Sequence, residues 1–136
     1  MRVATPSRTL LHRALLIDAL ASGAMGVPLA LAGQPLAALF RLPEPLLRGA
    51  GLVLLPFAIA VAYAGTRPIV PRGAAWAIVA LNMLWVVASV ALLVAVSPSP
   101  TALGGGFVIA QALAVLVFAE AQWIGLRRTS TFATAT

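Results

Sequence analysis

The chain has 136 residues, of which 62% are hydrophobic and 9% are charged, and its mean hydropathy is +1.04. An ordinary soluble domain is about 25% charged, so this composition excludes a conventional water-facing surface and indicates a membrane protein. The formal net charge is +6. The sequence has no cysteine, and this excludes disulfides, thiolate chemistry and zinc–thiolate sites.

Four apolar stretches follow one another along the chain, and each is near the ~20 residues that a helix needs to cross a bilayer. Backbone groups in lipid must be satisfied internally, and the ~10-residue alternation of barrel strands is not visible. We therefore predict an all-α polytopic membrane protein, a four-transmembrane-helix bundle forming a single domain over 1–126, with a polar cytoplasmic tail over 127–136. The expected spans are about 10–32, 46–65, 73–96 and 102–126.

The first apolar stretch could also be a signal peptide rather than a retained span. The residues 30–32, Ala-Leu-Ala, precede Gly33 in the manner of a signal-peptide cleavage site. The apolar run is longer than the ~7–15 residues of a signal peptide's apolar region, and Asp18 lies inside it. We therefore expect the span to be retained, and cleavage is the alternative.

The connector after the first span is itself apolar. Leu36, Leu39 and Phe40 lie at i, i+3 and i+4, a spacing that suits a short helix lying in the membrane interface. An apolar loop packed over the bundle is the other possibility.

Arginines mark the ends of the apolar stretches, where they determine orientation. Seven of them lie on the same side of the membrane as both termini, and two lie on the other side. Because the cytoplasmic side carries the excess of basic residues, we expect both termini in the cytoplasm. All nine basic residues are arginine, which favours a bacterial protein of the cytoplasmic (inner) membrane. This placement accounts for the charge without a nucleic-acid partner. The seven are Arg2, Arg8, Arg13, Arg67, Arg72, Arg127 and Arg128, and the two are Arg41 and Arg48.

Two carboxylates, Asp18 and Glu120, lie inside the first and last spans. Burying one in a bilayer costs on the order of 2.5–3.5 kcal/mol on insertion scales, unless it is protonated, paired or open to water. Ser22 shares a helix face with Asp18, and Asn82 lies near the middle of the third span. The candidate intramembrane polar site is therefore Asp18, Ser22, Asn82 and Glu120, as a proton-responsive or cation site.

A structural role is the alternative for both carboxylates. Asp18 could pair with Arg13, Arg67 or Asn82. Glu120 could extend toward Arg127 or Arg128 at the interface. Gln111 lies about 180° from Glu120 around the fourth helix, so those two cannot share one inward face.

Small residues predict close helix packing. Ala19 and Gly23, and likewise Ser22 and Gly26, are spaced four apart in the first span. Gly49 in the second span is a further packing candidate. No enzyme, metal or cofactor is expected, because the single histidine has no partner network for catalysis or ligation and no glycine loop precedes a lysine.

The stretch Leu47-Arg48-Gly49-Ala50-Gly51, which follows the loop Leu39-Phe40-Arg41-Leu42-Pro43, resembles small four-span bacterial inner-membrane proteins of unassigned function. The order of elements is similar to that of the DoxX-like families. The resemblance implies a four-helix inner-membrane protein and carries over no catalytic residue.

Two functions remain open. The first is a non-catalytic accessory or scaffold subunit of a larger membrane complex, or a self-associating bundle, in contact with membrane lipid. The second is a small proton- or cation-coupled transporter or pore, acting as a homo-oligomer through Asp18. It would resemble the small multidrug carriers, although their carboxylate is a glutamate nearer mid-span.

Overall fold

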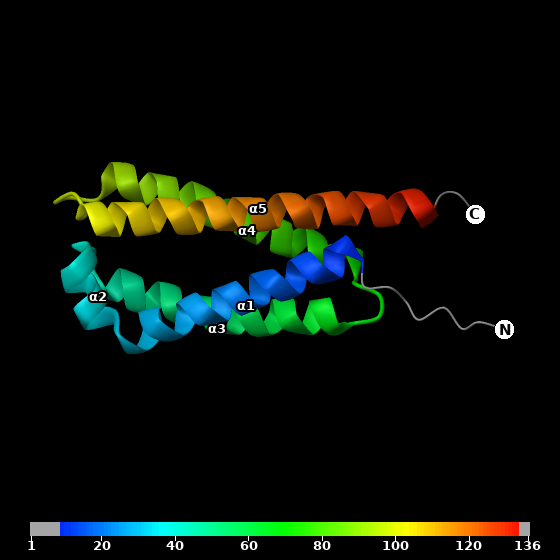
Figure 1. The fold of residues 1–136 in the computed structure, drawn as a ribbon, viewed down its shortest axis with the longest axis horizontal. Helices are drawn as coiled ribbons and strands as arrows, with labels where there is room; N and C mark the ends of the chain where they lie inside the picture. The colour runs from blue at the N-terminus through cyan, green and yellow to red at the C-terminus, as the bar shows by residue number, and fades with distance from the viewer. Residues whose placement is uncertain (1–8, 134–136) are drawn as a thin grey trace.

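The computed structural model describes residues 9–133, with side chains as far as residue 129, and over this range the regular structure is entirely helical (Figure 1). Four helices are long and apolar enough to cross a membrane, which confirms the predicted four-helix bundle and fits a multi-pass membrane protein. A short helix follows the first long one, which is the first of the two possibilities considered for this connector. The helices are α1 (Leu10–Leu31), α2 (Gly33–Phe40), α3 (Glu44–Thr66), α4 (Arg72–Ala95) and α5 (Ala102–Ala133).

The helix ends follow local sequence signals. The Thr9 hydroxyl accepts from the His12 backbone N–H and caps α1. Pro68 and Pro98 lie just beyond the ends of α3 and α4, where proline stops a helix. No proline follows Leu126, and α5 continues to Ala133. The helix thus extends beyond the span predicted to end at residue 126, because Arg127 and Arg128 lie on the same helix.

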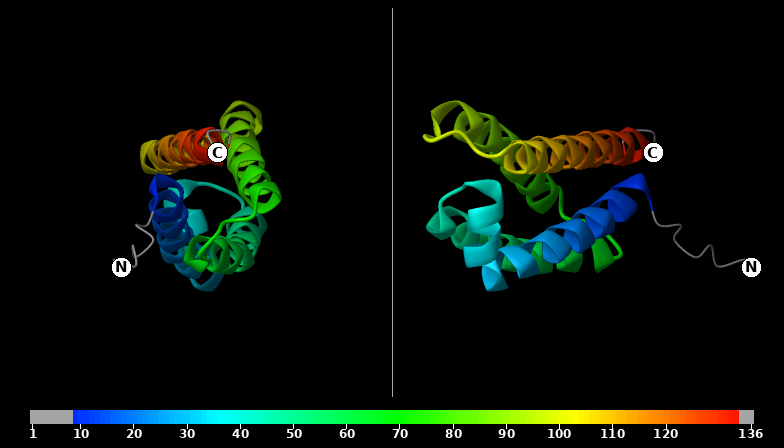
Figure 2. Two further views of the ribbon diagram at one scale, coloured as in Figure 1. Left: turned by 90° about the vertical axis from the view of Figure 1, so that its right-hand side faces the viewer. Right: turned by 60° about the vertical axis from the view of Figure 1, so that its left-hand side comes forward.

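The long helices form two layers (Figure 1). α1 packs along α3 in one layer, α4 packs against α5 in the other, and α5 also contacts α1. Figure 2 shows α4 inclined across α5, and α3 and α4 barely touch although the loop 67–71 joins them. The start of α1, this loop and the end of α5 lie at one end of the bundle, with α2 at the other.

The contact between α1 and α3 depends on glycine. A Cβ on Gly26 would lie 3.1 Å from the Cβ of Leu54, and one on Gly51 would lie 2.8 Å from the Gly26 carbonyl oxygen. A Cβ on Gly23 would meet ordinary van der Waals contact, and Ala19 is buried. Gly49 has nothing within 4 Å of such a Cβ. The packing prediction for Gly49 is therefore corrected to Gly51, which faces α1.

α5 is fixed to the other layer near both of its ends. A Cβ on Gly125 would lie 2.7 Å from the Leu11 backbone nitrogen, so α5 and the start of α1 are in close contact. At the opposite end the rings of Phe40 and Phe107 stack with centroids 4.8 Å apart. The Thr101 backbone N–H donates to the Phe40 carbonyl over 3.0 Å.

α1 contributes to the centre of the bundle. Leu11 and Leu15 pack with Val61 and Leu126 in one apolar cluster of buried side chains. Cleavage after residue 32, the alternative considered for the first span, would remove both leucines and Asp18 from the interior. Large apolar side chains on the outer faces, such as Leu20, are exposed, as expected where helices face lipid.

Candidate functional site

Asp18 lies at the centre of a buried polar cluster that joins α1, α4 and α5. Its side chain is 0% exposed. The Ser22 hydroxyl donates to Oδ1 over 3.1 Å, and the amides of Asn82 and Gln122 donate to Oδ2 over 2.8 and 2.6 Å. The Asn82 amide also donates to the Gln122 side-chain carbonyl over 3.0 Å. One carboxylate therefore connects three helices through direct hydrogen bonds.

Each donor is placed by its own helix. Ser22 follows Asp18 by four residues, so the two side chains lie on one face of α1. Asn82 and Gln122 are buried on the faces that α4 and α5 turn toward α1. Hydrogen bonds to a carboxylate are shorter and stronger than those between neutral groups, which explains how this side chain is accommodated among apolar residues.

The arginines that could have paired with Asp18 lie elsewhere. Arg13 is exposed, and the guanidinium of Arg67 donates to the Tyr63 hydroxyl over 2.6 Å. Asn82 is thus the partner realised among the three predicted possibilities. Amide donors take the place of a counter-ion.

Glu120 does not belong to this cluster. It is exposed on α5, and among the described residues it forms neither an ion pair nor a hydrogen bond. Gln122, two residues later and about 200° around the helix, faces Asp18 instead. The expectation that Glu120 shares a site with Asp18 is corrected accordingly. The guanidinium of Arg127, one of its predicted partners, lies 4.8 Å from the Trp123 ring centroid.

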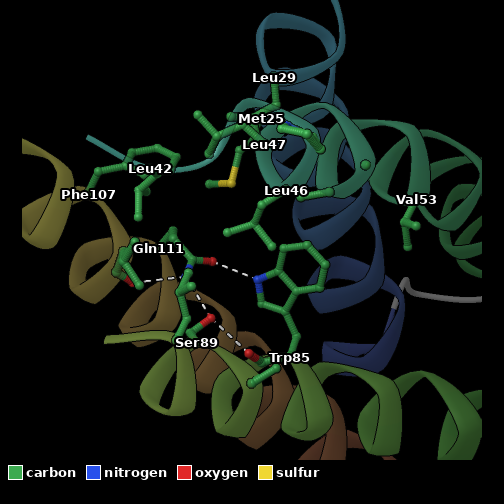
Figure 3. A pocket seen from close by; sticks show the side chains of 16 residues that line it. Met25, Leu29, Leu42, Leu46, Leu47, Val53, Trp85, Ser89, Phe107 and Gln111 are labelled. Atoms are coloured by element: carbon green, nitrogen blue, oxygen red, sulfur yellow. Dashed lines mark hydrogen bonds between the residues drawn. The ribbon is translucent and has the colours of Figure 1, made fainter. Parts of the chain in front are cut away.

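A second polar cluster joins α4 and α5 nearer to α2 (Figure 3). The Trp85 indole N–H donates to the Gln111 side-chain carbonyl over 2.7 Å. The Gln111 amide donates to the Ser89 hydroxyl and to the Val108 carbonyl over 2.9 and 2.8 Å. Among the described residues, no buried side-chain nitrogen or oxygen lacks a partner. Both clusters are thus internally satisfied.

Apolar cavities adjoin both clusters. One of about 540 Å³ is lined by all four long helices, including Ser22, Asn82 and Phe57. A second of about 420 Å³ extends toward α2, and Figure 3 shows Trp85 and Gln111 at its edge. Its remaining lining is almost entirely apolar. The cavities can therefore hold hydrocarbon beside a few polar groups whose hydrogen bonds are already made.

Metal ligands are not clustered in the part of the chain that the structure describes, where no three His, Cys, Asp or Glu side chains come together. The three residues around Asp18 offer two amides and a hydroxyl. Their N–H and O–H groups donate to Asp18, so these donors stabilise the carboxylate where a cation would otherwise be needed.

Gln122 is the member of the site that sequence reasoning missed, although a signal was available. It follows Gln111 by eleven residues, which places the two about 20° apart on a helix. Two amides on one face of an apolar helix indicate the buried side. The comparison of Gln111 with Glu120 alone did not show which of the two lies on the buried face of this helix.

Over the described residues, the helices and the buried clusters define a class, a helical multi-pass membrane protein with two polar clusters in an otherwise apolar interior. No protein-family model matches the chain, and no curated protein or solved structure shows significant similarity to it.

Proposed function

We propose that the protein is a non-catalytic integral protein of the bacterial cytoplasmic membrane, acting as an accessory or scaffold subunit or as a self-associating bundle. The observation that carries this proposal is the complete enclosure of Asp18, whose two oxygens accept from donors of this chain. A carboxylate held in this way braces helices together. Both Asp18 oxygens are thus engaged by this chain's own donors rather than directed at a substrate.

Extraction in a mild detergent followed by native mass spectrometry tests this role. We expect a hetero-complex or a homo-oligomer that survives extraction. Exposed apolar side chains such as Leu20 and Ile59 offer contact surfaces for other helices. A monomer accompanied by lipid alone would argue against both forms of the proposal.

The proposed topology places both termini in the cytoplasm. The chain has no cysteine, so single substitutions can be labelled without background. We expect Ser99→Cys, in the loop between α4 and α5, to react with a membrane-impermeant maleimide in intact cells. Thr129→Cys near the end of α5 should react only after the membrane is opened, and the reverse pattern would invert the topology.

A small proton- or cation-coupled transporter is the second candidate. It is favoured by the position of Ser22 and Asn82, which bind Asp18 and also line the 540 Å³ cavity. In proteoliposomes Asp18→Asn would then abolish proton-linked flux, whereas Glu120→Gln would leave it intact. Absence of flux in the parent protein, or unchanged flux in Asp18→Asn, would eliminate this candidate.

A further inference from the structure

Three cavities lie in a row along the seam between α3 and α4. The first, of about 330 Å³, lies between the end of α3 and the start of α4 and is lined in part by Arg67. It shares Phe57, Ala60 and Leu81 with the 540 Å³ cavity. That cavity shares Trp85 and four other residues with the 420 Å³ cavity. The row therefore follows α3 along most of its length.

The seam is open to the side. Val53, Leu81 and Leu84 line the cavities and are nevertheless 60%, 50% and 62% exposed. The lining near Arg67 includes four alanines, Ala60 and Ala64 on α3 and Ala74 and Ala77 on α4. These alanines occupy little volume, so α3 and α4 leave space between them at this point.

The size of the space favours a hydrocarbon chain over a helix. A methylene group occupies about the volume of one liquid water, ~30 Å³, so a chain of 14–18 carbons fills about 420–540 Å³. A helix about 10 Å wide fills about 420 Å³ in a single turn. The 540 Å³ cavity thus accepts one acyl chain but little more than one helical turn.

The mouth of the seam carries positive charge without a matching carboxylate. Arg67 lines it, and Arg72 directly follows the lining residue Pro71. Neither arginine forms an ion pair within the described residues. The sequence has three carboxylates: Asp18 is enclosed, Glu44 pairs with Arg48 over 2.6 Å, and Glu120 lies on α5.

A phosphate group complements the positive charge of Arg67 and Arg72. Guanidinium groups bind phosphate through paired, charge-assisted hydrogen bonds, and basic pockets between membrane helices bind anionic headgroups. Arg67 donates one bond to Tyr63, and a guanidinium has five N–H donors. We propose that the seam binds one anionic phospholipid, with its phosphate at Arg67 and Arg72 and one acyl chain between α3 and α4.

Native mass spectrometry of the full chain with phosphatidylglycerol or phosphatidylcholine tests the headgroup. We expect preferential retention of phosphatidylglycerol. Since each arginine near a membrane surface contributes about 1 kcal/mol, Arg67→Gln and Arg72→Gln should each weaken retention about five-fold, and together about 25-fold. Arg13→Gln, at the same end but on α1, should change it little. Equal loss in all three single variants, or no preference between the lipids, would overturn the proposed headgroup site.

The acyl-chain position is tested by filling the seam. Ala77→Phe should reduce retention of both lipids, whereas Ala80→Phe, on the same helix but lining none of the three cavities, should not. A dimer that only Ala77→Phe dissociates would assign the seam to a second copy and overturn the proposal. Crosslinking of the unaltered chain with photoactivatable phosphatidylglycerol needs no substitution, so its result does not depend on how a variant folds. Crosslinks should concentrate on Phe57, Leu81 and Trp85, and an even distribution over α1 and α5 would refute it.

Discussion

Replacing Asp18 by alanine is expected to lower the free energy of unfolding in mixed micelles by about 2–4 kcal/mol, since single interhelical hydrogen bonds in membranes contribute roughly 0.6–1.7 kcal/mol. The substitution removes hydrogen bonds from Ser22, Asn82 and Gln122 together. It also leaves two buried amides with fewer acceptors, and an unsatisfied buried donor carries its own cost. Reversible unfolding in mixed micelles, followed by circular dichroism, measures the change.

Glu120→Ala is the matched control, because it removes the other intramembrane carboxylate from an exposed position on α5. Its effect should stay within about 0.5 kcal/mol, as for ordinary surface substitutions. Asp18→Asn should be intermediate, since an amide retains an acceptor oxygen but presents N–H groups to the Asn82 and Gln122 donors. Equal small effects of both alanine variants would show that Asp18 does not brace the bundle.

Gly51→Val should destabilise the protein by about 3 kcal/mol or more, above the usual range for overpacking. A Cβ at Gly51 would approach the backbone of α1 at Gly26, Leu29 and Ala30. Backbone atoms cannot rotate aside as a flexible side chain can, so α1 and α3 must separate. The same unfolding measurement applies.

Gly49→Val controls for the general cost of valine in a helix. Gly49 lies on the same helix and nothing approaches its position within 4 Å. We expect less than about 1 kcal/mol, which is the size of propensity differences alone. Similar losses at both positions would mean that the two helices do not depend on this close contact.

The helices were predictable because lipid imposes a length on every apolar run and proline marks several of the breaks. α4 ends at Ala95, one residue before the predicted end of its span and three before Pro98. α5 continues past the predicted span end at 126, because hydropathy falls at Arg127 while nothing there interrupts helical geometry. Hydropathy thus predicts where a helix leaves the apolar layer, and a helix can continue beyond that point.

The polar site was predictable only where both hydrogen-bonded residues lie on the same helix. Asp18 and Ser22 pair through helical spacing. The choice of Gln122 over Glu120 depends on the rotation of α5, which the contacts of Gly125 with Leu11 and of Thr101 with Phe40 determine. Those contacts join residues more than 60 positions apart in the chain, and spacing within one span does not reveal them.

The two-layer arrangement also bears on biogenesis. The chain crosses between the layers once, at residues 67–71, so α1 to α3 can be inserted before α4 and α5 are synthesised. In lipid, apolar helix surfaces distinguish poorly between partners, whereas a carboxylate that needs two amides is selective. Asp18 would thus determine how α4 and α5 dock on α1 to α3, because only one rotation of these two helices brings Asn82 and Gln122 to its carboxylate.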